Sequence, residues 1–266
     1  MRPLQIGFIG VGQMGRPMVD RLIGAGWQTK VFVRRADQRA ELEAAGIAVA
    51  DSAVALAADV DLLILCLFSD GQVRESVIES GALAAMKPGS VVVCHTTGSP
   101  DQSPEMQASA PDGVTVLDVP ISGTADHVRS GQLTLLVGGD AAALERVRAA
   151  LASYADPILE VGGLGDGQRI KLINNLLFTV HLRVGIEAAA LAESIGIPAT
   201  EFSRIVSACS GDSFVVRMFR DVRPQAMGTS AKHFLAKDVE VVRAVADEQH
   251  IDLGLLGELA GWVFEG

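Results

Sequence analysis

The chain has 266 residues, 49% of them hydrophobic, and a formal net charge of -10. This composition suffices for a sizeable core in one large domain or two ordinary ones, and the acidic balance argues against nucleic acid or an anionic membrane as a partner. Three cysteines without a CxxC motif or a neighbouring His pair indicate neither a disulfide framework nor a metal site, and we expect three buried thiols. No apolar run reaches the roughly 18 residues that span a bilayer, so a cytoplasmic protein is expected.

The first predicted element is a strand at residues 6–9, which leads into a glycine-rich loop and a helix over 16–27. That order of elements is typical of a dinucleotide site. Gly10 would permit a sharp turn, Gly12 would let the backbone approach a pyrophosphate, and Gly15 would let helix and strand pack closely. The predicted cofactor-binding residues of this loop are Gly10, Val11, Gly12, Gln13, Met14 and Gly15. The alternative is a turn that needs glycines for its own geometry alone.

The second predicted strand, residues 29–33, ends at Arg34 and Arg35, about 20 residues past the glycines, where a ribose-reading residue is expected. An acid at this place would accept hydrogen bonds from a free 2′-hydroxyl, whereas two guanidinium groups can bind a 2′-phosphate. The sequence therefore favours NADP as the cofactor. NAD stays an alternative because Asp37 lies nearby, and the two arginines could also be solvated surface residues.

Strand-like runs alternate with helix-like segments up to residue 163. The further predicted strands cover 61–68, 90–94, 114–121, 133–139 and 157–161, and the predicted helices cover 36–46, 69–79 and 140–155. Such alternation describes the α/β class, with a doubly wound, mostly parallel sheet that has helices on both faces. We therefore predict a Rossmann domain over residues 1–163.

Long helical stretches replace the alternation after a Gly-rich turn at 162–167. We predict an all-helical second domain over residues 164–266 that serves substrate binding and dimerisation. Its first helix could run about 28 residues, or on the order of 40 Å, before Gly196 and Pro198. A helix of this length is expected to join the two domains and to pack against a second subunit in a homodimer or higher homo-oligomer.

The candidate chemistry lies on this long helix. Lys171 and Asn175 are four residues apart and project from one face, with Asn174 beside them, in an otherwise apolar run. A lysine and two amides are expensive to bury unless they meet polar partners, and a substrate is one such partner. The alternative is a lysine that snorkels to water and an asparagine pair that ties the helix to the sheet domain. Further candidates are Asp118, Ser122, Gly123 and Lys237.

Four stretches together resemble the β-hydroxyacid dehydrogenase family. This family includes 3-hydroxyisobutyrate dehydrogenases, tartronate semialdehyde reductases and the reductases of glyoxylate and succinic semialdehyde. They are FIGVGQMGRPM, DVPISGTADHVRSGQLTLLVGG, GLGDGQRIKLINNLL and FLAKDVEVV, and the resemblance covers nearly the whole chain. It implies hydride transfer between NADP(H) and a small β-hydroxyacid or semialdehyde. The 6-phosphogluconate dehydrogenases share much of this pattern but are far longer.

The resemblance also assigns roles to residues. It implies that Lys171 is the catalytic general acid/base, that Asn175 is a substrate-binding amide, and that Lys237 lies near both cofactor and substrate. The further residues implied to bind a substrate carboxylate or to line the cofactor cleft are Ser122, Gly123, Thr124, Asn174, Leu67, Phe68 and Thr96. Thr124 stands where a glycine is usual, and Phe68 where proline is common.

Two other readings of the sequence stay open. An imine reductase has a similar two-domain architecture but commonly lacks the catalytic lysine, so Lys171 argues for a carbonyl or alcohol substrate. A non-catalytic NADP-binding protein would keep Gly10, Gly12 and Gly15 yet would not need the pair Lys171 and Asn175.

Overall fold

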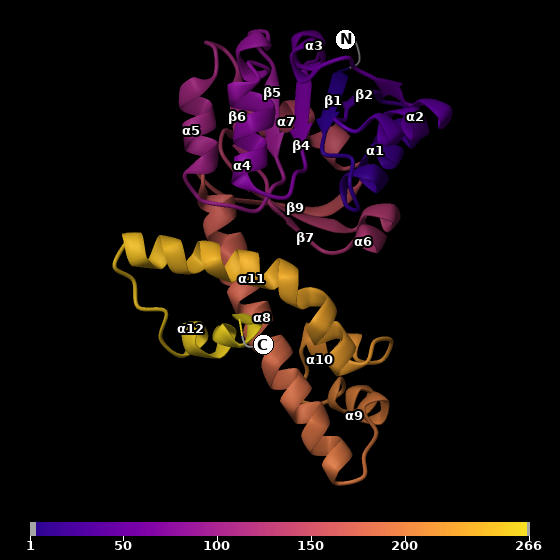
Figure 1. The fold of residues 1–266 in the computed structure, drawn as a ribbon, viewed down its shortest axis with the longest axis vertical. Coiled ribbons are helices and arrows are strands. Elements are labelled where there is room, and N and C mark those ends of the chain that lie inside the picture. The colour runs from indigo at the N-terminus through magenta and orange to yellow at the C-terminus, as the bar shows by residue number, and fades with distance from the viewer. Residues whose placement is uncertain (1–3, 265–266) are drawn as a thin grey trace. The chain divides into compact units, whose positions relative to one another are not determined.

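The computed structural model describes residues 4–264 and consists of two compact units, Met1–Lys171 and Leu172–Gly266. Figure 1 labels most of their helices and strands. One helix, α8 (Asp166–Ser194), begins in the first unit and ends in the second. Its 29 residues confirm the single long helix predicted at this place.

The first unit is built on one sheet in which the strand order is β3-β2-β1-β4-β5-β6-β8-β7, with β9 paired to β8. Strands β1 to β6 run parallel, β8 is antiparallel to β6 and β7, and β9 is parallel to β8. The doubly wound α/β class predicted from the sequence is therefore confirmed. The strands are β1 (Gln5–Ile9), β2 (Gln28–Phe32), β3 (Ala48–Val49), β4 (Leu62–Leu65), β5 (Val91–Cys94), β6 (Thr115–Asp118), β7 (Ile121–Ser122), β8 (Leu133–Gly138) and β9 (Ala155–Gly162).

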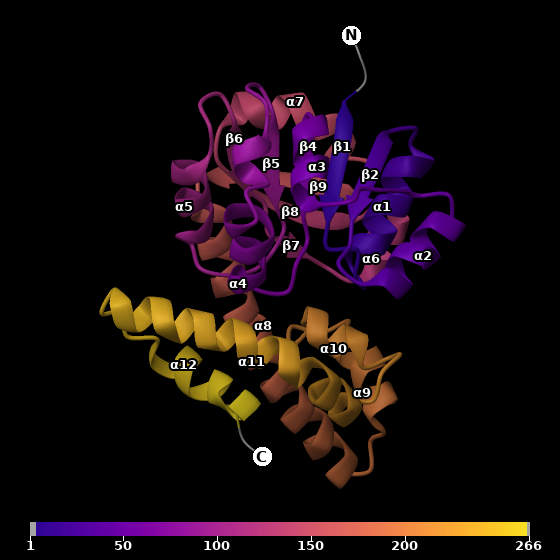
Figure 2. The same ribbon diagram turned by 45° about the horizontal axis from the view of Figure 1, so that its top comes forward.

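Helices pack on both faces of this sheet (Figure 2) because successive strand residues point to opposite sides. Leu62 and Ile64 of β4 lie in one apolar cluster with α1, α2 and α7, whereas Leu63 and Leu65 lie in the other with α3 and α5. Continuous apolar strands are what a sheet buried on both faces requires. The helical elements are α1 (Gly15–Gly24), α2 (Ala36–Ala44), α3 (Ala53–Asp59), α4 (Asp70–Val73), the π-helix Arg74–Glu79, the 3₁₀ helix Leu83–Ala85, α5 (Gln102–Ser109), α6 (Ala125–Ser130) and α7 (Ala141–Leu151).

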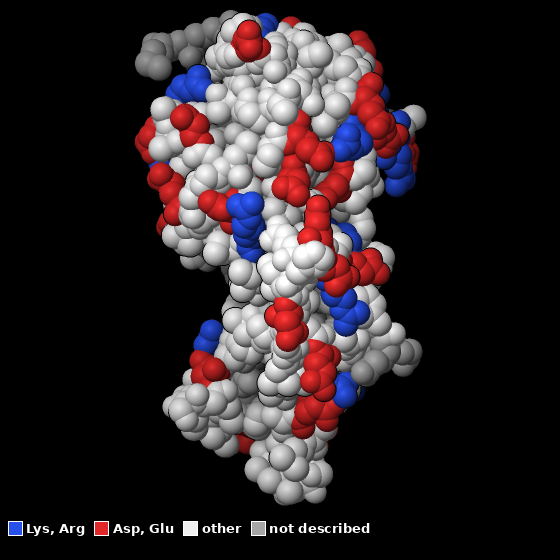
Figure 3. Space-filling view, turned by 90° about the vertical axis from the view of Figure 1, so that its left-hand side faces the viewer, with Lys and Arg blue, Asp and Glu red and all other residues white. Residues whose placement is uncertain are grey.

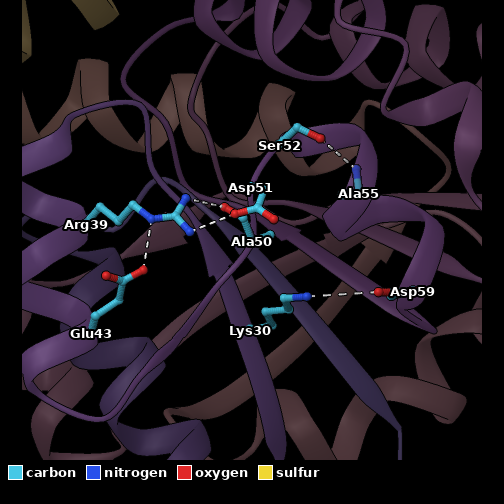
Figure 4. Close-up of polar contacts among 8 residues, drawn as sticks. All are labelled: Lys30, Arg39, Glu43, Ala50, Asp51, Ser52, Ala55 and Asp59. Atoms are coloured by element: carbon cyan, nitrogen blue, oxygen red, sulfur yellow. Dashed lines mark hydrogen bonds and ion pairs between the residues drawn. The ribbon is translucent and has the colours of Figure 1, made fainter.

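Strand β3 was not predicted, because two residues at a sheet edge leave no hydrophobic pattern. Polar contacts hold this edge instead (Figure 4). Arg39 of α2 donates to Ala50 O at 3.1 Å and to Asp51 Oδ1 at 2.8 Å, and its Nε lies 2.9 Å from Glu43 Oε1. Ser52 then caps α3 by accepting the Ala55 N–H at 3.0 Å.

The described part of the second unit is entirely helical, as predicted. Its apolar core joins α8 to α10 and α11, with Leu176 and Leu182 packed in one cluster with Phe219 and Val239. Trp262 closes this core, and its Nε1 donates to Thr179 O at 3.1 Å. The helices that follow α8 are α9 (Ala199–Val206), α10 (Phe214–Met218), α11 (Pro224–Glu248), α12 (Gly254–Ala260) and the 3₁₀ helix Gly261–Phe264.

The three cysteines are not all buried, and the expectation of three buried thiols is wrong. Cys94 is buried, Cys66 is partly buried and Cys209 is exposed. Burial raises the pKa of the Cys94 thiol to about 12, which keeps it in the unreactive neutral form. Cys209 follows α9 in a polar turn, where no core is available to cover it.

On the face drawn in Figure 3, basic side chains are scattered among acidic ones and form no continuous basic patch. Among the helices of residues 4–264, α8 has the length and mean hydropathy (1.2) of a candidate membrane span. This is weak evidence for a span, because the core helix of a soluble protein passes the same test.

Candidate functional site

The glycine-rich loop follows β1 and lies against the end of β4. Gly10 has φ of +101°, and a Cβ there would lie 2.1 Å from Cys66 O. A Cβ on Gly15 would lie 2.0 Å from Gly10 O. The fold therefore requires glycine at both positions. A Cβ on Gly12, in contrast, would meet nothing within 4 Å, so neither packing nor a left-handed backbone explains a glycine there.

The open space beside Gly12 suits an anion. Helix α1 begins at Gly15, no side chain caps its N-terminus, and no acidic residue lies in its first turn. Free N–H groups and the helix dipole at such a terminus favour phosphate. The loop is fixed from outside, because Gln38 Nε2 donates to Val11 O at 2.6 Å. The residues present thus fit the pyrophosphate of a dinucleotide.

The two arginines predicted to read a 2′-phosphate follow β2 and are exposed. Arg34 Nη1 lies 2.8 Å from Glu75 Oε2, on the π-helix. Arg35 forms an ion pair with Asp37, and its guanidinium holds the pKa of that carboxyl below its usual value. Each guanidinium group already has a carboxylate partner, which a 2′-phosphate would have to displace.

The loops that follow β4 and β5 are tied together at Thr96. Thr96 is buried, and its Oγ1 accepts the Leu67 N–H at 3.0 Å. Phe68 is 41% exposed, and its N–H donates to Gln72 Oε1 at 3.0 Å. Thr96 thus shapes the loop that Leu67 and Phe68 occupy.

The predicted carboxylate-binding segment forms β7 and the start of α6. Ser122 ends β7, and Gly123 has φ of +138°, so the turn itself favours glycine there. Thr124 precedes α6, and its N–H donates to His127 Nδ1 at 3.1 Å. That amide is already engaged, which leaves the Ser122 hydroxyl and the Gly123 N–H for a carboxylate. His127 has a capping role that its position near this segment did not reveal.

The first turn of α8 is anchored by a buried network that sequence reasoning did not find. Gln168 N donates to Asp118 Oδ2 at 2.9 Å, and Gln168 Nε2 donates to Asp118 Oδ1 at 3.0 Å and to Thr96 O at 2.9 Å. Gln168 Oε1 accepts the Gly98 N–H at 3.0 Å. Asp118 was a candidate because it ends a strand. Nothing in the sequence around Gln168 indicates its partners.

Asp118 sits in this network as a buried carboxyl group. Burial raises its pKa to about 6, while the N–H groups of Gln168 and of the backbone at Gly165 and Gly167 favour the charged form and limit the rise. The helix backbone comes very close, since a Cβ on Gly167 would lie 2.8 Å from Asp118 Oδ2.

Lys171 and Asn175 lie one turn apart on α8, and each is only 8% exposed. The side chain of Lys171 is therefore largely covered by other residues. In the second unit, Asn175 Nδ2 donates to Asp238 Oδ2 at 2.5 Å, and Asn174 Nδ2 donates to Asn175 Oδ1 at 3.1 Å. Lys237 Nζ lies 3.3 Å from Asp238 Oδ1. The asparagine pair thus contacts α11 through Asp238, and the structure brings Asn174, Asn175 and Lys237 together as predicted candidates.

A strand order that reverses beside β1, with a glycine-rich loop at that point, is typical of a dinucleotide-binding domain of the Rossmann class. Residues 4–264 contain no group of three or more His, Cys, Asp or Glu side chains that could hold a metal ion. Residues 5–163 match the NAD binding domain of 6-phosphogluconate dehydrogenase, and residues 165–263 match the NAD-binding domain of NADP-dependent 3-hydroxyisobutyrate dehydrogenase.

Individual relatives agree with these matches. The chain is 30% identical to 2-(hydroxymethyl)glutarate dehydrogenase of Eubacterium barkeri, over 96% of this chain and 81% of the relative. It is 34% identical to the NAD-dependent L-serine dehydrogenase of Pseudomonas aeruginosa, over 81% and 73%. The structure of Mycobacterium tuberculosis 3-hydroxyisobutyrate dehydrogenase with L-serine superposes with a TM-score of 0.87 at 27% identity, over 99% and 93%. The chain belongs to the β-hydroxyacid dehydrogenase family and is an oxidoreductase that binds a nicotinamide dinucleotide.

Proposed function

We propose that this protein transfers a hydride between NADP(H) and a small β-hydroxyacid or its semialdehyde, with Lys171 as the general acid/base. The observation that carries the proposal is the buried Lys171 one turn from Asn175, on the helix that follows the dinucleotide-binding sheet. The carbonyl oxygen of a substrate must take up a proton during reduction, and a lysine ammonium group beside the cofactor is a suitable donor.

The residues of the first unit account for cofactor binding in this proposal. A bound nicotinamide supplies or accepts the hydride. Gly12 and the N-terminus of α1 hold the pyrophosphate, and Leu67, Phe68 and Thr96 belong to the loops that border the cofactor. Arg34 and Arg35 favour NADP over NAD, because two neighbouring guanidinium groups can bind a 2′-phosphate through charge-assisted hydrogen bonds. The NAD-dependent relative makes NAD the alternative.

The remaining candidates orient the substrate. In reduction, Lys171 Nζ donates a proton to the carbonyl oxygen, and in oxidation it accepts the proton of the hydroxyl group. Ser122 and the Gly123 N–H bind the carboxylate, with charge from Lys237 and shape from Thr124. Asn175, held by Asp238 and Asn174, directs its amide toward the reacting oxygen.

The names of two relatives point to the substrate class. L-serine and 2-(hydroxymethyl)glutarate each carry a hydroxymethyl group on the carbon next to a carboxyl group. A carboxylate site two carbons from the reacting carbon suits both. We extend that class to this chain and propose a small carboxylate of this type as its substrate.

We also propose that the protein forms a homodimer through α8. Exposed apolar side chains recur on this helix at spacings of four and seven residues, which places them on one face. They are Ile173, Leu177, Val184, Leu191 and Ile195. A second copy of α8 is the occupant that would cover the stripe.

The test is a turnover assay with NADPH and NADH, followed by the absorbance of the reduced nicotinamide. For the reduction direction, the panel contains glyoxylate, a cyclic imine and three semialdehydes, those of succinate, tartronate and methylmalonate. For the oxidation direction, it contains L-serine and 2-(hydroxymethyl)glutarate. Lys171→Ala is compared with the wild type, and the exposed Lys87→Ala is the matched control.

The proposal expects aldehyde turnover that falls by about 10²-fold or more in Lys171→Ala and persists in Lys87→Ala, with cofactor affinity unchanged in both. Turnover of the imine alone would instead favour an imine reductase. Cofactor binding without any turnover would favour a non-catalytic binding protein.

A further inference from the structure

Gln168 is fully buried, and each polar atom of its side chain is bonded. Its three partners belong to two neighbouring strands: Asp118 ends β6, and Thr96 and Gly98 lie in the loop after β5. The amide orientation is fixed by chemistry, because Nε2 faces two acceptors and Oε1 faces one donor. A flipped amide would lose all three bonds.

We propose that Gln168, held by Asp118, is a positioning residue that sets the place of Lys171 for proton transfer. This inference rests on the proposed function, because it requires Lys171 to move the proton. Gln168 lies three residues before Lys171 on α8, about one turn or 4.5 Å along the helix axis. Any shift of the first turn therefore moves the lysine with it.

The first turn has little freedom to shift while the network is intact. A Cβ on Gly167 would lie 2.8 Å from both Asp118 Oδ2 and Leu136 O, so the helix backbone is already at contact distance from the sheet. The Asp118 carboxylate accepts the Gln168 N–H, one of the N-terminal donors that a helix leaves without a partner inside it. A negative group at this terminus also complements the helix dipole.

The network joins Lys171 to the loops that border the cofactor in the proposed function. Thr96 accepts from Gln168 through its backbone carbonyl and from Leu67 through its hydroxyl. A proton donor must lie within hydrogen-bond reach of the substrate oxygen, and a misplacement of 1 Å can reduce the rate by about 10²-fold. Gln168 thus sets a distance on which turnover depends, rather than only adding stability.

The test compares Gln168→Met and Gln168→Glu with the control Gln107→Met. Met retains the approximate length of Gln without its hydrogen bonds, whereas Glu retains an acceptor for the Gly98 N–H and loses the donors to Asp118 and Thr96. Gln107 makes a similar pair of backbone bonds at the opposite end of β6, where Nε2 donates to Val114 O at 3.0 Å and Oε1 accepts the Val116 N–H at 2.7 Å.

We expect both Gln168 variants to lower kcat about 10- to 100-fold while the Kd for NADPH changes less than about 3-fold. The control should lose thermal stability and keep its kcat within about 2-fold. Gln168→Glu serves if Gln168→Met does not fold. A kcat for the Gln168 variants equal to that of the control would overturn the proposal.

A double-mutant cycle separates positioning from general weakening. In a Lys171→Ala background, Gln168→Met should cause no further loss of kcat, because the group that it positions is gone. Losses that multiply independently would refute an action through Lys171. If Lys171→Ala alone is as active as the wild type, the proposed function has failed, and that outcome is distinct from either result of the cycle.

Discussion

Gly12→Ala separates the binding role of the glycine-rich loop from its folding role. A Cβ at this position meets no protein atom within 4 Å, and the backbone is outside the left-handed region that favours glycine. The fold should therefore tolerate alanine. A Gly-to-Ala change at a compatible site even stabilises a protein by about 0.4–1 kcal/mol, because the unfolded chain loses conformational freedom.

The same methyl group occupies the space that a pyrophosphate needs. A phosphate oxygen that accepts a backbone N–H lies about 2.9 Å from the nitrogen, whereas an added carbon atom requires about 3.5 Å to its neighbours. The cofactor must then move away from the loop. A lost hydrogen bond to a charged group corresponds to about 1.5–3 kcal/mol, so the loss of one bond raises the Kd of the cofactor roughly 10- to 150-fold.

Isothermal titration with NADPH and a thermal melt measure the two effects on one preparation. Gly24→Ala is the matched control, because a Cβ there also meets nothing within 4 Å and the residue ends α1 away from the loop. Gly15→Ala should instead unfold the domain, since its Cβ would lie 2.0 Å from Gly10 O. If Gly12→Ala binds NADPH as tightly as the wild type, the pyrophosphate does not lie over Gly12 and the reasoning fails.

Three further changes test charge and assembly. Glu75→Gln removes the carboxylate that lies 2.8 Å from Arg34. The Kd for NADPH should then fall about 2- to 5-fold, while the Kd for NADH stays constant. Equal changes in the Kd of both cofactors would contradict a contact between Arg34 and the 2′-phosphate. Burial lowers the pKa of His95 to about 4. Below about pH 6.5 the unfolded chain binds a proton at this histidine and the native state does not, so the unfolding free energy should fall between about pH 6.5 and 4. Burial raises the pKa of Asp118 to about 6, so between about pH 6 and 4 the native state holds a proton that the unfolded chain releases, and this group stabilises the fold as the pH falls. Asp118→Asn removes that contribution, so the unfolding free energy from urea titrations should fall more steeply with falling pH. An unchanged dependence of the unfolding free energy on pH would count against this linkage. Leu191→Glu places a charge on the exposed α8 stripe and should convert a dimer to a monomer in light scattering, whereas an unchanged mass excludes this face as the interface.

The elements predicted correctly are those whose burial leaves a pattern in the sequence. The continuous apolar runs of β4 and β5 predict strands buried on both faces, and the structure buries every residue of each. The run at 114–121 was predicted as one strand, but it divides into β6 and β7, which both pair antiparallel with β8. Pro120 lies between them and has no N–H to donate, so only its carbonyl oxygen bonds to β8, where it accepts the Leu136 N–H at 3.1 Å. The helix predicted at 69–79 contains a π-helical half, Arg74–Glu79, which hydrophobic periodicity does not distinguish from an α-helix.

Prediction of the candidate site followed a similar rule. Lys171 and Asn175 attract attention because polar groups in an apolar run require an explanation, and both are buried. Gln168 lies in the same segment and gave no such signal, because a glutamine near a helix start is common on a protein surface. Its partners lie 50, 70 and 72 residues away in the chain, and only the folded sheet brings them to it.

The three loop glycines show how folding and binding requirements can be told apart. Gly10 and Gly15 are explained by the chain itself, since a side chain at either would strike backbone atoms of neighbouring segments. These two therefore say little about function, because a turn of this shape needs them whether or not it binds a cofactor. Gly12 has no such internal reason, and it differs from Gly24, which is equally unconstrained, because it lies between a strand and a helix N-terminus, where a pyrophosphate would approach the backbone. Gly12 is for that reason the strongest single argument, within the loop, for a pyrophosphate in this place.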